Sequence, residues 1–288
     1  MSQLNNFDGL FRLDGKVALI TGGLKAPKGS RGLGLHTATA FLRAGAAHVL
    51  LAARKLEGEH GLTAALTALK QEIPGCETKV TIIASDLSRV SEVQTLVETV
   101  QSRVSKVDIL IANAGATWGG PLATTPDESI GKVLDLNVRS IINLVRVMSP
   151  LLEKSATPTD PSRIIIVGAI AGFTVPFTGE NSTIVYSVSK AAAHHLARNL
   201  AVELGPRNIT TNCIAPGFFP SKLSRGIIGI MGGIDNMKAA NPVGRIGMPE
   251  DIAGAMLYLC SQAGSFVNGI ILPLDGGNYL QSGLFTKL

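Results

Sequence analysis

Short apolar runs alternate with longer amphipathic stretches along the whole chain. The runs contain almost no polar residues, which is typical of strands buried on both faces of a parallel sheet. The stretches between them carry apolar residues at helical spacing. The predicted strands are residues 17–20, 48–52, 80–84, 109–112, 164–167, 209–214 and 270–272. The predicted helices are residues 35–44, 62–73, 93–104, 130–152, 187–204 and 250–259.

This alternation predicts an α/β fold with a single domain over residues 1–288. Because crossovers between parallel strands are right-handed, seven such strands form an open, doubly wound, Rossmann-like sheet with helices on both faces. Ligands of such sheets bind at the carboxyl ends of the strands. The loops that follow the predicted strands are therefore where a site is expected.

Composition narrows the class of protein. The 32 glycines favour tight turns, and the 3 cysteines favour a reducing, cytoplasmic location over a disulfide framework. The formal charge of +5 comes from basic residues spread along the chain, so nucleic-acid binding is a weak hypothesis. Polar residues interrupt the uncharged segment 252–274, and we expect neither a membrane span nor a secretory signal. No ligand spacing predicts a metal site.

A glycine-rich turn follows the first predicted strand. Thr21-Gly22-Gly23 ends the strand, and Gly32-Leu33-Gly34 opens the next helix. Backbone N–H groups and the positive end of a helix converge at such a turn, so it predicts an anion-binding site. A simple turn is the alternative interpretation.

The turn resembles the T-G-x-x-x-G-x-G motif of the short-chain dehydrogenase/reductase family. It fits that motif if residues 24–29 (LKAPKG) are an insertion. Lys25 and Lys28 of the insertion either reach a cofactor phosphate or lie in a solvated loop. The resemblance implies a dinucleotide cofactor bound by Gly22, Gly23, Ser30, Arg31, Gly32, Leu33 and Gly34.

The second predicted strand ends at Arg54, without the carboxylate that binds the ribose hydroxyls of NAD. Arg54 and Arg31 can flank a 2′-phosphate, because guanidinium groups suit bidentate contacts with phosphate. The resemblance therefore implies NADPH as the cofactor, with two solvated arginines as the alternative. Other cofactor contacts implied by the resemblance are Asp86, Leu87, Asn113, Ala114 and Gly115. For Asp86, a helix-capping role shared with Ser88 is the alternative.

Tyr186 and Lys190 match the family's Y-x-x-x-K motif, and their i,i+4 spacing puts both on one helix face. A cation stabilises a phenolate, so we expect Lys190 to lower the pKa of Tyr186. The resemblance implies that Tyr186 is the proton donor, that Lys190 also holds the nicotinamide ribose, and that Asn137 supports a relay water. The family's nicotinamide-contacting segment is matched by Pro216, Gly217, Phe219 and Ser221.

One expected residue is absent. Ala169 stands at the end of the fifth predicted strand, where the family has a serine. Thr178, Ser182 or Thr183 could supply the hydroxyl instead. Two explanations of Ala169 are open. Either the chain natively lacks the hydroxyl, or it carries a Ser-to-Ala change in an active enzyme.

These features predict an NADPH-dependent reductase of a ketone or other carbonyl in a small, largely apolar substrate. The segments GPRNITTN and PGFFPSKL are similar to ketoacyl reductases of rhamnolipid pathways. The rival hypothesis is an NADP-binding protein with a non-redox role, such as isomerisation, cyclisation or ligand sensing. We expect a homo-oligomer, a tetramer, because family members pair their fifth and sixth helices. Aromatic residues that either line the substrate pocket or pack in the core are Trp118, Phe173, Phe177 and Phe218.

Overall fold

The computed structural model describes residues 7–24, 31–221 and 225–281. Its strands are β1 (Val17–Thr21), β2 (His48–Ala53), β3 (Val80–Ala84), β4 (Ile109–Ala112), β5 (Ser162–Val167), β6 (Ile209–Pro216) and β7 (Ile271–Leu274). Its helices are α1 (Leu33–Arg43), α2 (Leu62–Glu72), α3 (Val90–Arg103), α4 (Asp127–Leu134), α5 (Ser140–Glu153), α6 (Ile184–Leu204), α7 (Arg225–Ile230), α8 (Ile234–Ala239) and α9 (Pro249–Cys260).

The strands form one parallel sheet in the order β3-β2-β1-β4-β5-β6-β7. The prediction of a doubly wound, seven-stranded sheet is confirmed. The strand order reverses between β1 and β4, which lie side by side with Thr21 opposite Ala112. Loops from these two strands therefore part in opposite directions, and this opening is where such sheets bind ligands.

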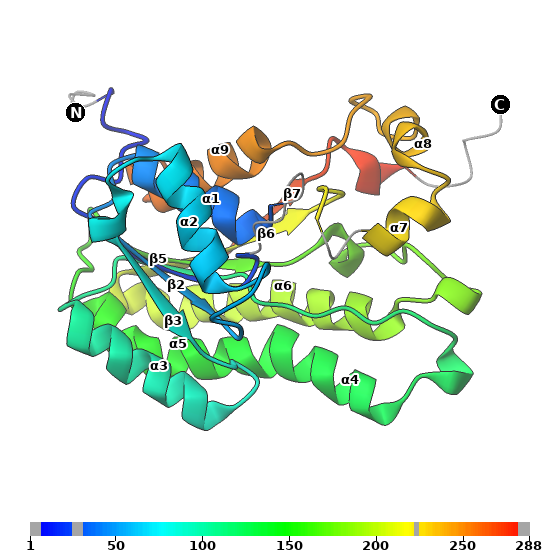
Figure 1. Cartoon of the computed structure of the whole chain (residues 1–288), viewed down its shortest axis with the longest axis horizontal. Coiled ribbons are helices and arrows are strands. Elements are labelled where there is room, and N and C mark those ends of the chain that lie inside the picture. The colour runs from blue at the N-terminus through cyan, green and yellow to red at the C-terminus, as the bar shows by residue number, and fades with distance from the viewer. Residues whose placement is uncertain (1–6, 25–30, 222–224, 282–288) are drawn as a thin grey trace.

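Helices cover both faces of the sheet (Figure 1). Helices α1, α2 and α9 lie on one face and bury an apolar core that includes Leu35, Leu62 and Met256. Helices α3, α5 and α6 lie on the other face and bury a second core that includes Leu96 and Met148. Because both faces are covered, β1, β4, β5 and β6 consist of buried residues throughout. This is the physical reason for their near-continuous apolar runs.

The predicted helix 130–152 has a different internal structure. It is α4, one π-helical turn (Asp135–Arg139) and α5 in succession. A π turn carries one extra residue between its hydrogen-bonded groups, and such turns often occur at functional sites. Helices α7 and α8 were not predicted, because a short apolar segment interrupted by glycines has no clear helical period.

An ion network joins the amino ends of β1, β4 and β5, at the edge opposite the opening. The Lys16 ammonium lies 2.5 Å from Asp160 and 3.6 Å from Asp108. Arg163 is 1% exposed and pairs with Asp160 at 2.6 Å. Asp108 also accepts a hydrogen bond from the backbone N–H of Val17 at 2.9 Å. These groups hold three central strands in register at one end.

Candidate active site

The glycine-rich turn after β1 is packed backbone against backbone. Gly22 and Gly23 have φ values of 65° and 62°, a region that favours glycine. A Cβ on Gly22 would lie 2.4 Å from the Cα of Ala114, and a Cβ on Gly34 would lie 2.2 Å from the carbonyl oxygen of Gly22. Side chains at these positions would therefore separate the turn from α1 and from the loop after β4.

The N-terminus of α1 has no side-chain cap. Its N-cap, Gly32, is extended and makes no side-chain hydrogen bond. Leu33 and Gly34 open the helix directly beside the turn, and the N-terminal end of a helix is where a phosphate group is expected to bind. Ser30, Lys25 and Lys28 lie outside the described residues, as does most of the proposed insertion.

The loop after β4 is tied to the end of β1. The Thr21 hydroxyl accepts from the N–H groups of Asn113 at 3.2 Å and Ala114 at 3.4 Å. The Asn113 amide donates to the carbonyl oxygen of Thr21 at 3.1 Å. These hydrogen bonds fix Asn113 at the edge of the site, and Ala114 packs directly on Gly22.

Asp86 does not cap α3, so that alternative is wrong. The helix begins at Val90 after Arg89, which provides no side-chain cap. Asp86 instead accepts from the N–H of Ser88 at 3.1 Å and from its hydroxyl at 2.7 Å, forming a turn before the helix. Leu87 is buried, at 5% exposure. Both residues lie just beyond the carboxyl end of β3.

The two arginines assigned to the 2′-phosphate lie differently. Arg54 is exposed just beyond β2. Burial would raise the pKa of Asp86, but the hydrogen bonds from Ser88 lower it, and the charge of Arg54 lowers it further. Arg31 forms an ion pair with Glu72 at the end of α2. That partner was not predicted, because Glu72 is 41 residues away along the chain.

Asn137 lies in the π turn and is 1% exposed. Its amide donates to the carbonyl oxygen of Ala116 at 2.9 Å, and its oxygen accepts from the Ala116 N–H at 2.8 Å. The amide also donates to the hydroxyl of Ser189 at 2.9 Å. An Asn within a helix is unfavourable unless its side chain finds a partner, and Asn137 finds partners in the loop after β4 and in α6.

Ser189 was not predicted as a site residue. It is fully buried, and its hydroxyl donates to the carbonyl oxygen of Tyr186 at 2.7 Å while accepting from Asn137. It therefore joins the π turn to the first turns of α6. Only its place one residue before Lys190 could have drawn attention to it.

Tyr186 and Lys190 share one face of α6, with the Lys190 nitrogen 5.7 Å from the centre of the Tyr186 ring. Lys190 donates to the carbonyl oxygen of Val167 at the end of β5, at 2.8 Å. Gly115 lies beside them, since a Cβ there would be 3.7 Å from the Lys190 nitrogen. The helix thus brings the phenol and the ammonium to the carboxyl edge of the sheet.

The expected lowering of the Tyr186 pKa is not found. Burial raises the pKa of Tyr186 to about 12, and burial lowers the pKa of Lys190 to about 8. At 5.7 Å the ammonium does not offset the loss of water around the phenol. Tyr186 is therefore protonated at neutral pH, and Lys190 remains mostly charged.

Ala169 follows β5 and is 8% exposed. His194 packs behind it, since a Cβ on Gly168 would lie 2.6 Å from one ring nitrogen and a Cβ on Gly172 would lie 2.5 Å from a ring carbon. Burial, with the nearby charge of Lys190, lowers the pKa of His194 to about 4. A neutral imidazole therefore supports the backbone on both sides of residue 169.

The three hydroxyls considered as substitutes lie in the segment before α6. Ser182 is buried, and its carbonyl oxygen accepts from the N–H of Gly120 at 2.9 Å. The Thr183 hydroxyl lies 3.4 Å from that of Ser187. Thr178 is exposed. The hydrogen bond from Gly120 ties this segment to the loop after β4.

The aromatic candidates divide between packed and exposed positions. Phe173 is 40% exposed and stacks between His194, at a centroid distance of 4.5 Å, and Tyr279, at 5.4 Å. Trp118 is 38% exposed, and Phe177 and Phe218 are partly buried. Tyr279 was not predicted, because only the return of the chain after β7 brings it here.

The segment after β6 packs on the chain that follows β7. Pro216 ends β6, and Gly217 lies so close to Asp275 that a Cβ would approach its side chain to 2.5 Å. Phe219 is buried in the first core, with its ring against Gly247. Its ring therefore belongs to the core, and Ser221 lies at the end of the described segment.

Residues 28–278 match the family model described as enoyl-(acyl carrier protein) reductase. The chain is 36% identical over 270 residues to the rhamnolipids biosynthesis 3-oxoacyl-(acyl-carrier-protein) reductase of Pseudomonas aeruginosa, a match that covers 94% of this chain and 98% of that protein. The chain belongs to the short-chain dehydrogenase/reductase family. It is therefore an oxidoreductase of that family, as its motifs predicted.

One further protein and one solved structure are similar to this dehydrogenase/reductase over almost its whole length. The 7alpha-hydroxysteroid dehydrogenase of Escherichia coli K12 is 34% identical over 277 residues, covering 94% of this chain and 97% of that protein. The structure of a Pseudomonas aeruginosa RhlG/NADP active-site complex superposes with a TM-score of 0.81 and 34% identity, covering 94% of this chain and 99% of that one. Within the described residues, no helix has the length and apolar character needed to cross a membrane.

Proposed function

We propose that this protein reduces the carbonyl group of a small, largely apolar substrate with NADPH. The observation that carries the proposal is the pairing of Tyr186 and Lys190 on one face of α6, at the edge where the glycine-rich turn and the loop after β4 meet. A proton donor and an anion-binding turn on one edge of a Rossmann-like sheet suit transfer between a dinucleotide and a carbonyl group.

The cofactor is NADP(H). The similarity to the RhlG/NADP complex supports it, as does the absence of a carboxylate at the end of β2. Gly22, Gly23 and the uncapped start of α1 would hold the pyrophosphate, and Arg54 with Arg31 would hold the 2′-phosphate. When bound, NADPH supplies the hydride that a carbonyl carbon accepts.

Tyr186 is the proton donor in this proposal. Because its pKa is raised, the phenol carries its proton at neutral pH and can give it to the carbonyl oxygen as negative charge develops there. The ammonium of Lys190 stabilises the phenolate that remains and would bind the nicotinamide ribose. Lys190 already has one acceptor in Val167, so its nitrogen is held at a fixed position.

In this proposal Asn137 has two roles. It holds the loop after β4 against α6, and it supports the return of a proton to Tyr186. Its three hydrogen bonds fix the loop after β4 and the start of α6 relative to each other. Gly115 lies next to both the side-chain oxygen of Asn137 and the nitrogen of Lys190, and a relay water would lie in this region. Hydrogen bonds that support the reacting residues in this way keep a proton donor in its productive geometry.

The substrate side of the site is apolar in this proposal. Trp118 and Phe173 present exposed ring surface at the carboxyl edge, and α7 and α8 add the exposed side chains of Ile230, Met231 and Ile234. Figure 1 places α7 and α8 at the same end of the molecule as the loops after the strands. A ketone with an apolar body would bury this surface.

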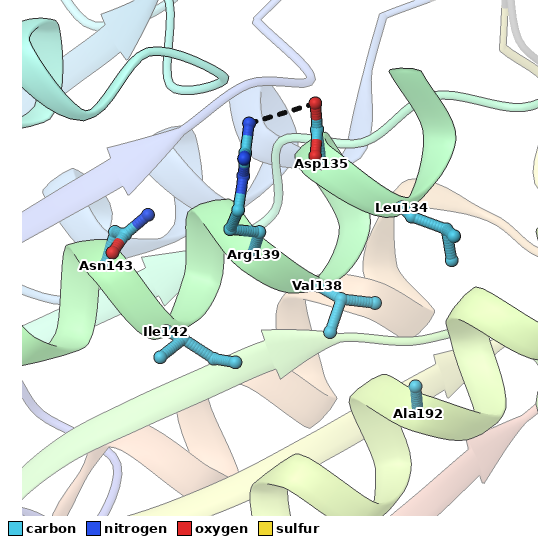
Figure 2. Close-up of a pocket in the computed structure, with 7 residues that line it drawn as sticks. All are labelled: Leu134, Asp135, Val138, Arg139, Ile142, Asn143 and Ala192. Atoms are coloured by element: carbon cyan, nitrogen blue, oxygen red, sulfur yellow. Dashed lines mark ion pairs between the residues drawn. The ribbon is translucent and has the colours of Figure 1, made fainter. Parts of the chain in front are cut away.

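We also propose a homo-oligomer, a tetramer in the family's manner. A groove on the outer face of the helices has apolar walls from Val138, Ile142 and Ala192, and an ion pair between Asp135 and Arg139 (Figure 2). Ile142 is 45% exposed. A second copy fits this face, because charges of both signs beside an apolar strip can pair across a twofold axis.

A cytoplasmic location completes the proposal. Cys76, Cys213 and Cys260 are all buried and unpaired, which suits a reducing compartment.

The cofactor assignment has a direct test. We expect the protein to bind NADPH more tightly than NADH and to oxidise NADPH when an activated ketone is added, seen as loss of nicotinamide absorbance. Charge-assisted hydrogen bonds from the arginines to the 2′-phosphate contribute about 1.5 to 3 kcal/mol each, so Arg54→Asp should reverse the preference. Equal affinities of the unmodified protein for both cofactors would contradict the assignment.

A further inference from the structure

The side chain of Arg31 is engaged by an acidic residue of α2. Its guanidinium pairs with the carboxylate of Glu72 at the end of α2, and both side chains are partly buried, at 31% and 27% exposure. Glu72 also accepts from Arg43 at the end of α1, at 3.0 Å. One carboxylate thus bridges two arginines from the two ends of α1.

The neighbours of Arg31 show where its charge lies. Burial lowers the pKa of His36, and the charge of Arg31 lowers it further, so the guanidinium lies near the first turn of α1. Glu72 and Glu250 oppose that effect, which places these carboxylates on the same flank. The guanidinium therefore lies close to the start of α1, where the Glu72 carboxylate engages it.

We propose that Glu72 is a specificity-determining residue that competes with the 2′-phosphate of NADPH for Arg31. The proposal rests on the proposed function, in which Arg31 contacts that phosphate. A guanidinium that binds the phosphate must leave or share the carboxylate, and the carboxylate itself repels a phosphate nearby. NADH has no 2′-phosphate, so Glu72 lowers the affinity for NADPH while leaving that for NADH unchanged.

Arg43 moderates this competition. It binds the same carboxylate with a side chain that is 61% exposed. Without Arg43, Glu72 would pair with Arg31 alone and hold it more firmly. The effects of changing Glu72 and Arg43 on NADPH affinity therefore have opposite signs.

The test is calorimetric titration of the folded protein with NADPH and with NADH at low ionic strength. Glu72→Gln should tighten NADPH binding by about three- to fivefold, the range expected for removing one partly exposed ion pair, and leave NADH binding unchanged. Glu98→Gln removes the same charge from an exposed position on α3 and should change neither affinity. Circular dichroism on each variant confirms that the fold is retained.

Arg43→Gln provides the second arm. It should weaken NADPH binding, and the same change in the Glu72→Gln background should have little effect, because the carboxylate through which it acts is gone. Weaker or unchanged NADPH binding in Glu72→Gln overturns the inference, since it would mean that Glu72 orients Arg31 or does not affect it. The proposed function has a separate readout: it fails if the unmodified protein binds both cofactors equally, whatever Glu72→Gln does.

Discussion

Ala169 lies just after β5, at the position where the resemblance to the family predicts a serine. The position is tightly enclosed, because His194 fills the space against Gly168 and Gly172. Ala169→Ser adds one oxygen without a new branch, and the added group would donate to the substrate oxygen as negative charge develops. Losing one such donor in other enzymes lowers turnover by about 10² to 10³, so we expect a gain of comparable size in NADPH-dependent ketone reduction.

Tyr186→Phe in the Ala169→Ser background is the matched control. It should abolish the gain, because the carbonyl oxygen then has no immediate proton donor. Unchanged turnover of Ala169→Ser across several ketones, with NADPH still bound, would rule out a serine-dependent mechanism. Another residue would then supply the donor, or the site would carry out a reaction other than reduction.

Lys190 gives the reaction a defined pH dependence. Burial lowers its pKa to about 8, so its ammonium is present below that pH and is lost as the pH rises through it. Tyr186, with a pKa of about 12, keeps its proton over the same range. We expect kcat/KM for ketone reduction to be level near neutral pH and to fall above about pH 8.

Lys190→Arg separates charge from geometry in this prediction. A guanidinium stays charged to a pKa above about 12, so the variant should be slower but should lose the fall near pH 8. A fall at the same pH in Lys190→Arg would assign the titration to another group.

Among the elements, the central strands were the most predictable, because burial on both faces leaves an apolar run that no amphipathic helix shares. The strand ends differ from the predicted ones by a few residues at most, as in Val17–Thr21 against 17–20. The π turn at Asp135–Arg139 was not predictable in this way. One added residue in a helical turn shifts the apolar period too little to be seen over a helix of this length.

The candidate site was predictable where its residues follow one another in sequence. Tyr186 and Lys190 lie on one helix, so their spacing alone places them together. The contacts of Ser189 with Asn137 and of Phe173 with Tyr279 join segments that are far apart in the chain. They depend on how elements pack on the sheet, and no local pattern of residue types encodes that.

The amino ends of the strands provide a stability prediction. Lys16 and Arg163 hold the pKa of Asp160 below its usual range, although burial alone would raise it. Asp160→Asn leaves Arg163 buried without its carboxylate. We expect the free energy of unfolding at neutral pH to fall by about 1 to 3 kcal/mol, between the values typical of exposed and buried ion pairs, measured by urea denaturation.

The sign of the pH dependence follows from the lowered pKa. Asp160 contributes stability above its ordinary pKa, and this contribution is lost as the pH falls through the folded-state value. The difference between Asp160→Asn and the unmodified protein should therefore shrink in acid. Asp235→Asn, which removes a 94% exposed carboxylate, should change stability by less than about 0.5 kcal/mol at any pH.

At the scale of the whole molecule, the groove lined by Val138, Ile142 and Ala192 predicts that copies of the chain associate. Light scattering at micromolar concentration should give a mass several times the 30.0 kDa of one chain. Ile142→Lys puts a charge into the groove and should shift the distribution toward smaller species, whereas Phe7→Lys, at an exposed site outside the groove, should not. A mass near that of one chain for the unmodified protein would refute the oligomer.

The sheet separates two tasks along the length of its central strands. β1, β4 and β5 each start at the ion network of Lys16, Asp108 and Arg163, and each ends at a residue or turn of the candidate site. A substitution that strengthens the ion network at the amino ends of these strands changes no side chain of the candidate site at their carboxyl ends. Heat tolerance and substrate choice can therefore be selected independently in the laboratory, by libraries confined to opposite rims of one sheet.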